Sequence, residues 1–175
     1  MDDRKKAAIY LLMLNRYKEL INEKETKTIT EIRKMTEPNK PFLNHLLKRI
    51  IPEWPTIGQL EAINRIIGYF RTIETCEFSL TFWLKPEEID EIRAADSPNK
   101  ALLFVALLRS LGVENAKVYI TKSGSYYAGF SLQGKNYLFL PKNNALVENE
   151  EIAKIFAQDP PTCAFNDLNY ENFEE

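Results

Sequence analysis

The segment from Ala94 to Gly112 (AADSPNKALLFVALLRSLG) constrains the fold of this chain more than any other. We predict a helix here, with Ser97 as its N-cap, Pro98 at its first position and Gly112 at its C-terminal stop. The residues from Ala101 to Leu108 are all apolar. A helix that is apolar all round is buried on nearly every side. The rest of the chain must therefore supply the layers that cover it.

The half of the chain before this segment has the apolar spacing of helices. We predict helices over 3–24, 28–35 and 42–51, a long one from an N-cap at Thr56 through Phe70, and a short one opening at Lys85-Pro86 and ending near Ala94. Trp54, Phe82 and Trp83 are expected to pack in the core or between helices.

After Gly112 the period changes to alternation, which is typical of strands. We predict strands over 116–121, 126–132 and 136–140, a last helix over 148–157, and an acidic, loosely held tail over 160–175. The chain is therefore expected to be α+β, with a helical N-terminal half packed against a small antiparallel sheet. We divide one compact domain into a helical region (1–54), a core (55–159) and the tail.

Composition and charge exclude several classes of function. A net charge of −2 gives no reason to expect nucleic acid or an anionic membrane as partner. Cys76 and Cys163 match no disulfide or metal pattern, so we expect reduced thiols, no metal and no cofactor. The apolar run 7–14 is too short to span a bilayer and has no cleavage site after it, so we expect a cytoplasmic chain.

The order of motifs resembles a known family. W-L-x-P-E-E opens a short helix, L-L-R-x-L-G ends the buried helix, and strands carrying Y-A-x-F and Y-x-x-x-P follow. This order resembles the transglutaminase-like domain of the papain-like cysteine-enzyme superfamily, particularly its small archaeal and bacterial members, over residues 55–141. The family motif close to D-C-E-D-K-A-L-L is similar to the sequence from Asp96 to Leu103.

The resemblance implies a catalytic triad that this chain has lost. The family's cysteine, histidine and aspartate positions fall on Ser97, Tyr127 and Leu140. Tyrosine is a poor base near neutral pH, because its ordinary pKa is about 10, and leucine cannot orient a base. The only histidine, His45, is expected on an exposed helix face. Lys100 completes an S-x-x-K spacing with Ser97, which is a weak signal without its companion motifs.

We therefore expect a catalytically inactive protein that binds a peptide or protein through the former cleft. The residues expected to line that cleft are Trp83, Ser97, Asn99, Tyr126 and Tyr127. One alternative is an amidase or peptidase with Ser97 as nucleophile. Another is an assembly protein that dimerises through its N-terminal helices. The sequence leaves the oligomeric state open.

Overall fold

The computed structural model describes residues 2–20, 27–77 and 82–173. Its fold is α+β, as predicted. The helices are α1 (Asp3–Leu20), α2 (Ile29–Lys34), α3 (Pro41–Ile50), α4 (Gln59–Phe70), α5 (Pro86–Ile92), α6 (Ser97–Ser110) and α7 (Glu150–Gln158). The strands are β1 (Glu74–Thr75), β2 (Ala94–Ala95), β3 (Lys117–Thr121), β4 (Tyr126–Leu132), β5 (Lys135–Leu140), β6 (Ala145–Glu148), β7 (Pro161–Phe165) and β8 (Tyr170–Asn172).

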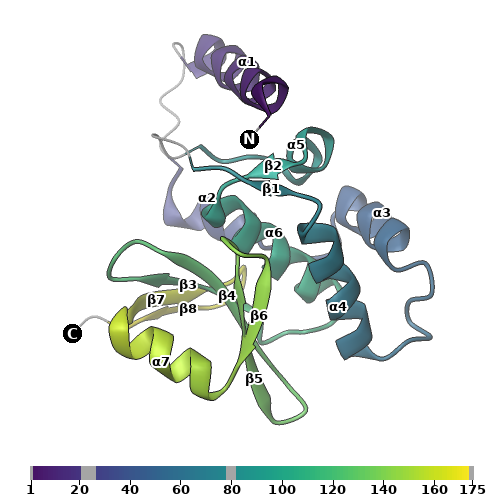
Figure 1. Cartoon of the computed structure of the whole chain (residues 1–175), viewed down its shortest axis with the longest axis vertical. Coiled ribbons are helices and arrows are strands. Elements are labelled where there is room, and N and C mark those ends of the chain that lie inside the picture. The colour runs from purple at the N-terminus through teal and green to yellow at the C-terminus, as the bar shows by residue number, and fades with distance from the viewer. Residues whose placement is uncertain (1, 21–26, 78–81, 174–175) are drawn as a thin grey trace.

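A six-stranded antiparallel sheet in the order β6-β5-β4-β3-β7-β8 forms one side of the molecule. Helix α6 packs on one face of this sheet, where the ring of Phe104 stacks on that of Phe139 at 4.2 Å between centroids. Phe70 of α4 contacts both rings edge-on or tilted. Helix α7 lies over the other face (Figure 1). The sheet is thus covered on both sides, and its main core lies on the α6 side.

The buried character predicted for α6 is confirmed. Every residue from Asn99 to Arg109 is buried. The helix ends where Gly112 takes a φ of +82°, which a side chain would strain. The amide of Gly112 bonds to the carbonyl of Arg109 and that of Val113 to the carbonyl of Leu108, so the last carbonyls are satisfied.

Helix α1 lies at the end of the molecule away from the sheet, beside β1, β2 and α5 (Figure 1). It contacts the rest of the chain through Ile9, which packs with Cys76 and Ala94. Strand β1 pairs in parallel with β2, and β2 leads directly into the N-terminus of α6. This short pairing fixes where α6 begins. No helix within the described residues is long and apolar enough to cross a membrane.

The structure corrects two predictions outside the site. Helix α4 begins at Gln59 after Gly58, so Thr56 is not its N-cap; the Thr56 hydroxyl instead donates to the carbonyl of Glu53. The C-terminal segment is not a loose tail, because β7 and β8 extend the sheet beyond β3. An ion pair joins Arg109 of α6 to Asp167 in the turn between β7 and β8, and both side chains are nearly buried. This pair holds the turn against α6. The part of the first predicted helix beyond Leu20 lies outside the described residues.

Candidate functional site

The N-terminus of α6 is capped by Asp96 instead of by Ser97. The Asp96 carboxylate accepts a hydrogen bond of 2.9 Å from the amide of Asn99, the third helical residue. Ser97 and Pro98 are therefore the first and second helical residues. A carboxylate stabilises this helix end more than a hydroxyl does, because its negative charge also interacts favourably with the positive end of the helix dipole. The prediction that Ser97 caps the helix is thus wrong by one residue.

Asn99 holds a neighbouring segment against the start of α6. Its side-chain oxygen accepts a bond of 2.7 Å from the amide of Leu84, and its nitrogen donates to the carbonyl of Phe82 at 2.7 Å. The same nitrogen donates to Asp96 at 2.6 Å. Asn99 is 1% exposed. It therefore does not line an open cleft, contrary to the prediction, and its amide is used entirely to fix the backbone of 82–84.

Asp96 and Tyr126 occupy one electrostatic neighbourhood. Burial raises the pKa of the Asp96 carboxyl above its ordinary value, and the bonds from Asn99 offset part of that effect. Burial also raises the pKa of Tyr126, and the charges of Cys163 and Asp96 raise it further. Tyr126 shares a sheet face with Ala128 and Phe130, which pack in the main core on the α6 side. Tyr126 therefore lies on the α6 side of the sheet, packed against the main core.

Tyr127 and Leu140 lie on the opposite face of the sheet. The ring of Tyr127 contacts that of Phe156 of α7 at 6.3 Å between centroids. Leu140 follows Phe139, whose ring stacks on α6, so the side chain of Leu140 points the other way. The sheet thus separates both residues from Ser97. The three positions carried over from the family do not converge.

Lys100 is completely buried one turn into α6. Its ammonium donates to the carbonyl of Ile73 at 2.8 Å, to the hydroxyl of Thr75 at 2.7 Å and to the side-chain oxygen of Asn144 at 3.0 Å. Burial lowers the pKa of Lys100 to about 8, although the nearby Cys76 and Glu74 oppose this. The three donors of the ammonium are matched by three neutral acceptors, none of which is Ser97. The S-x-x-K spacing therefore does not produce a serine–lysine pair.

The structure also places Trp83, His45 and the two cysteines. Trp83 is half-buried against the main core, and its carbonyl accepts a bond from Arg16 of α1. His45 is exposed on α3, as predicted. Both cysteines are free, and burial raises the pKa of Cys76 to about 11, so its thiol is poorly suited to act as a nucleophile.

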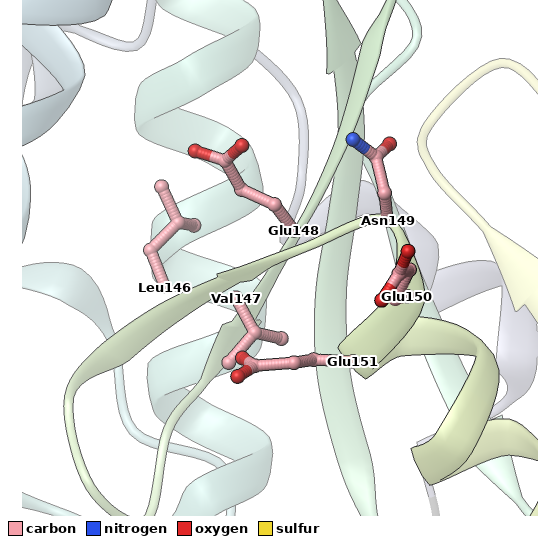
Figure 2. Close-up of a pocket in the computed structure, with 6 residues that line it drawn as sticks. All are labelled: Leu146, Val147, Glu148, Asn149, Glu150 and Glu151. Carbon is pink, nitrogen blue, oxygen red and sulfur yellow. The ribbon is translucent and has the colours of Figure 1, made fainter.

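An open hollow of about 480 Å³ lies where β6 meets α7, away from the start of α6. Figure 2 shows Leu146 and Glu148 directed to one side of β6 and Val147 to the other. Asn149 turns the corner at a φ of +36°, and Asn136 of β5 donates its amide to the Asn149 side chain. Within the described residues, no group of three or more His, Cys, Asp or Glu side chains is arranged to hold a metal ion. Glu148, Glu150 and Glu151 are exposed at this corner.

Comparison with known proteins adds one structure. No protein-family model matches the chain, and no curated protein matches it. A solved structure titled a "putative cysteine protease", from Cytophaga hutchinsonii, aligns with a TM-score of 0.46 and 18% sequence identity. The alignment covers 67% of this chain and 45% of the other, so this chain spans less than half of that protein. Similarity at this level does not establish a family.

The candidate site comprises the start of α6, with Asp96 and Ser97, and Tyr126 on the α6 side of the sheet; Asn99 and Lys100 are buried in the first turn of the helix. The sequence predicts both Tyr126 and Tyr127 in the cleft, but a signal in the strand distinguishes them. Ala128 and Phe130 are the apolar members of the alternating strand, and Tyr126 is in phase with them. Lys100 had no such signal, because a lysine beside an apolar run is usually assigned to the surface.

Proposed function

We propose that this chain is a non-catalytic domain that binds a peptide, and that its binding site is the surface around Ser97 and Tyr126. The observation that carries the proposal is that some polar groups there are occupied by hydrogen bonds within the protein and others are not. Asn99 and Lys100 are buried and fully occupied by structural hydrogen bonds. Ser97 and Tyr126 are half-buried, and no hydrogen bond within the described residues occupies either hydroxyl.

No hydrogen bond among the described residues joins the Ser97 hydroxyl to a base, and the neighbouring Asp96 carboxylate is bonded to Asn99, which supports a binding role over a hydrolytic one. A serine hydroxyl needs an adjacent general base to act as a nucleophile. Lys100 is turned toward Ile73, Thr75 and Asn144, and Tyr127 lies beyond the sheet. Two hydroxyls at the edge of an apolar core are instead suited to bind the amide groups of an extended peptide. We infer a descent from transglutaminase-like enzymes on the motif order alone.

A selection from a random peptide library displayed on phage tests this proposal. We expect enriched peptides to bind the wild-type chain and to lose at least about tenfold in affinity to Ser97→Trp, because the indole would fill the site. His45→Trp is the matched control, since it adds the same ring at an exposed position on α3. Circular dichroism would check that both variants fold.

Chemical-shift mapping on the wild-type chain gives a second result that depends on no variant. We expect the peptide to shift the amide signals of Ser97 and Tyr126. Peptides that bind Ser97→Trp as well as wild type, or that shift only signals elsewhere, would overturn the proposal.

A further inference from the structure

Helix α1 exposes an apolar face that nothing in the described structure covers. Tyr10, Leu11 and Leu14 are each 60% exposed or more, and Tyr17 is 46% exposed. Ala7 is exposed on the same face. Contiguous apolar patches on soluble proteins are usually small, and larger ones mark interaction sites. We call the residues Ala7, Tyr10, Leu14 and Tyr17 the α1 seam.

The opposite face of α1 already has its partners. Ile9 is buried against Cys76 and Ala94. Arg16 donates to both carboxylate oxygens of Glu88 at 3.1 and 2.9 Å, and its guanidinium lies 5.2 Å from the ring of Phe82. The helix is therefore anchored to the domain with a fixed rotation, and this rotation turns the seam outward. The exposure follows from the anchoring.

The spacing of the seam indicates that another helix covers it. Its members are separated by three, four and three residues, which is the spacing of the a and d positions of a coiled coil. A stripe of this kind is narrow and packs against a single helix.

The seam is complementary to itself in one orientation. If two copies of α1 cross in antiparallel about a two-fold axis, Ala7 lies opposite the partner copy's Tyr17 and Tyr10 lies opposite the partner copy's Leu14. Each tyrosine then meets a smaller side chain, so the layers interdigitate. In a parallel pair, each tyrosine would instead lie opposite the same tyrosine of the partner copy. Antiparallel packing also sets the two helix dipoles in opposite directions, which is favourable.

We propose that α1 is the interface of a homodimer in which two seams pack in antiparallel. This inference is independent of the proposed peptide site, which lies at the start of α6. The large side chains of the face offer on the order of 400 Å² per copy, from the area that aromatic side chains bury. Two copies would bury about 800 Å², below the 1,200 Å² or so of stable interfaces. The dimer is therefore weak and reversible.

Sedimentation equilibrium between about 1 µM and about 1 mM tests the dimer, because weak association is visible only in this range. We expect the wild-type mass to rise toward that of a dimer, and Leu14→Glu to weaken association at least tenfold, since a buried leucine contributes about that much. Leu168→Glu is the matched control: Leu168 is 69% exposed, on the turn between β7 and β8. Wild-type protein that stays monomeric, or an equal loss in Leu168→Glu, would overturn the proposal.

Disulfide trapping tests the orientation in a chain with Cys76 and Cys163 replaced by alanine. We expect Tyr10→Cys mixed with Leu14→Cys to form a crosslinked dimer in air, and neither variant alone to do so. Crosslinking of Tyr10→Cys with itself would contradict the antiparallel arrangement.

Discussion

The ring of Tyr127 packs against that of Phe156 of α7, 6.3 Å between centroids, on the face of the sheet away from α6. Its neighbour Tyr126 faces the other way, toward the core on the α6 side, where burial and the charges of Cys163 and Asp96 raise its pKa. The two adjacent tyrosines therefore have different roles. Tyr126 belongs to the proposed peptide site, whereas Tyr127 fastens α7 to the sheet.

The same substitution at these two neighbours separates their roles. We predict that Tyr126→Phe weakens peptide binding by about three- to tenfold, which corresponds to one hydrogen bond. Tyr127→Phe should leave peptide affinity unchanged, because its hydroxyl is on the far face. Isothermal titration with a selected peptide measures both. A loss of affinity in Tyr127→Phe equal to that in Tyr126→Phe would show that our assignment of faces is wrong.

Asn99 should contribute to stability through the segment it holds. Asn99→Ala leaves the amide of Leu84 buried without its acceptor and removes the hydrogen bond that Asn99 donates to the carbonyl of Phe82. We predict that the free energy of unfolding falls by about 2–4 kcal/mol, because unsatisfied buried groups carry the full desolvation cost. Urea denaturation measures it. Asn64→Ala, at an exposed position of α4, should change stability by less than about 0.5 kcal/mol; similar losses in both variants would refute the role of Asn99.

The lowered pKa of Lys100 predicts how the free energy of unfolding depends on pH. Its value of about 8 in the folded chain lies below the ordinary value of about 10.4 for an unfolded lysine. Between these values the unfolded chain holds more protons, so the contribution of Lys100 to stability rises with pH through this window. Cys76 acts in the opposite direction, because its pKa is raised to about 11. The comparison is therefore made in a Cys76→Ala background.

In that background we expect the unfolding free energy of the chain with Lys100 to rise with pH, relative to that of Lys100→Met, from about pH 8 to about pH 10. Methionine keeps the volume of the side chain and removes its charge. The measurement is urea denaturation at a series of pH values. Parallel curves for the two chains would mean that the amine is not perturbed by burial.

Gly129 makes room for the ring of Tyr119. A β-carbon at residue 129 would lie 2.6 Å from the Cε2 atom of Tyr119, whose ring is held by Phe156 at 5.6 Å. We predict that Gly129→Ala destabilises the chain by about 1–3 kcal/mol, as overpacking does. Gly68→Ala should instead stabilise by about 0.5–1 kcal/mol, because nothing lies near its β-carbon and α4 favours alanine.

A double-mutant cycle identifies the contact responsible. If the ring of Tyr119 causes the cost at residue 129, Gly129→Ala should be much less harmful in a Tyr119→Ala chain. Additive losses would place the strain elsewhere.

Local signals predicted much of the fold. The apolar run of α6, its glycine stop and the alternation of β4 depend on residues close in sequence, and the structure has these elements where the pattern puts them. The C-terminal strands depend on distant partners instead. β7 pairs with β3, and Asp167 meets Arg109, 58 residues earlier in the chain. An acidic segment with two prolines carries no local trace of these contacts.

The candidate site was predicted only in part for a similar reason. A motif places residues in order along the chain but does not decide which face of a strand they occupy, and one residue of offset reverses the face. Motif order assigns Tyr127 to the histidine position, and the sequence predicts that both tyrosines line the cleft, but only Tyr126 lies on the α6 side of the sheet. The burial of Lys100 follows from Ile73, Thr75 and Asn144, which converge only in the folded chain.

Covalent labelling with an alkyl fluorophosphonate tests the central claim, that the surface around Ser97 binds without catalysing. The reagent is applied to wild type and to Ser97→Ala from about pH 6 to about pH 10, which spans the ordinary titration of histidine, cysteine and tyrosine. We predict that wild type is labelled no more than Ser97→Ala at any pH, because within the described residues no base is hydrogen-bonded to this hydroxyl. Labelling of wild type that Ser97→Ala abolishes would contradict the account and assign Ser97 as a nucleophile.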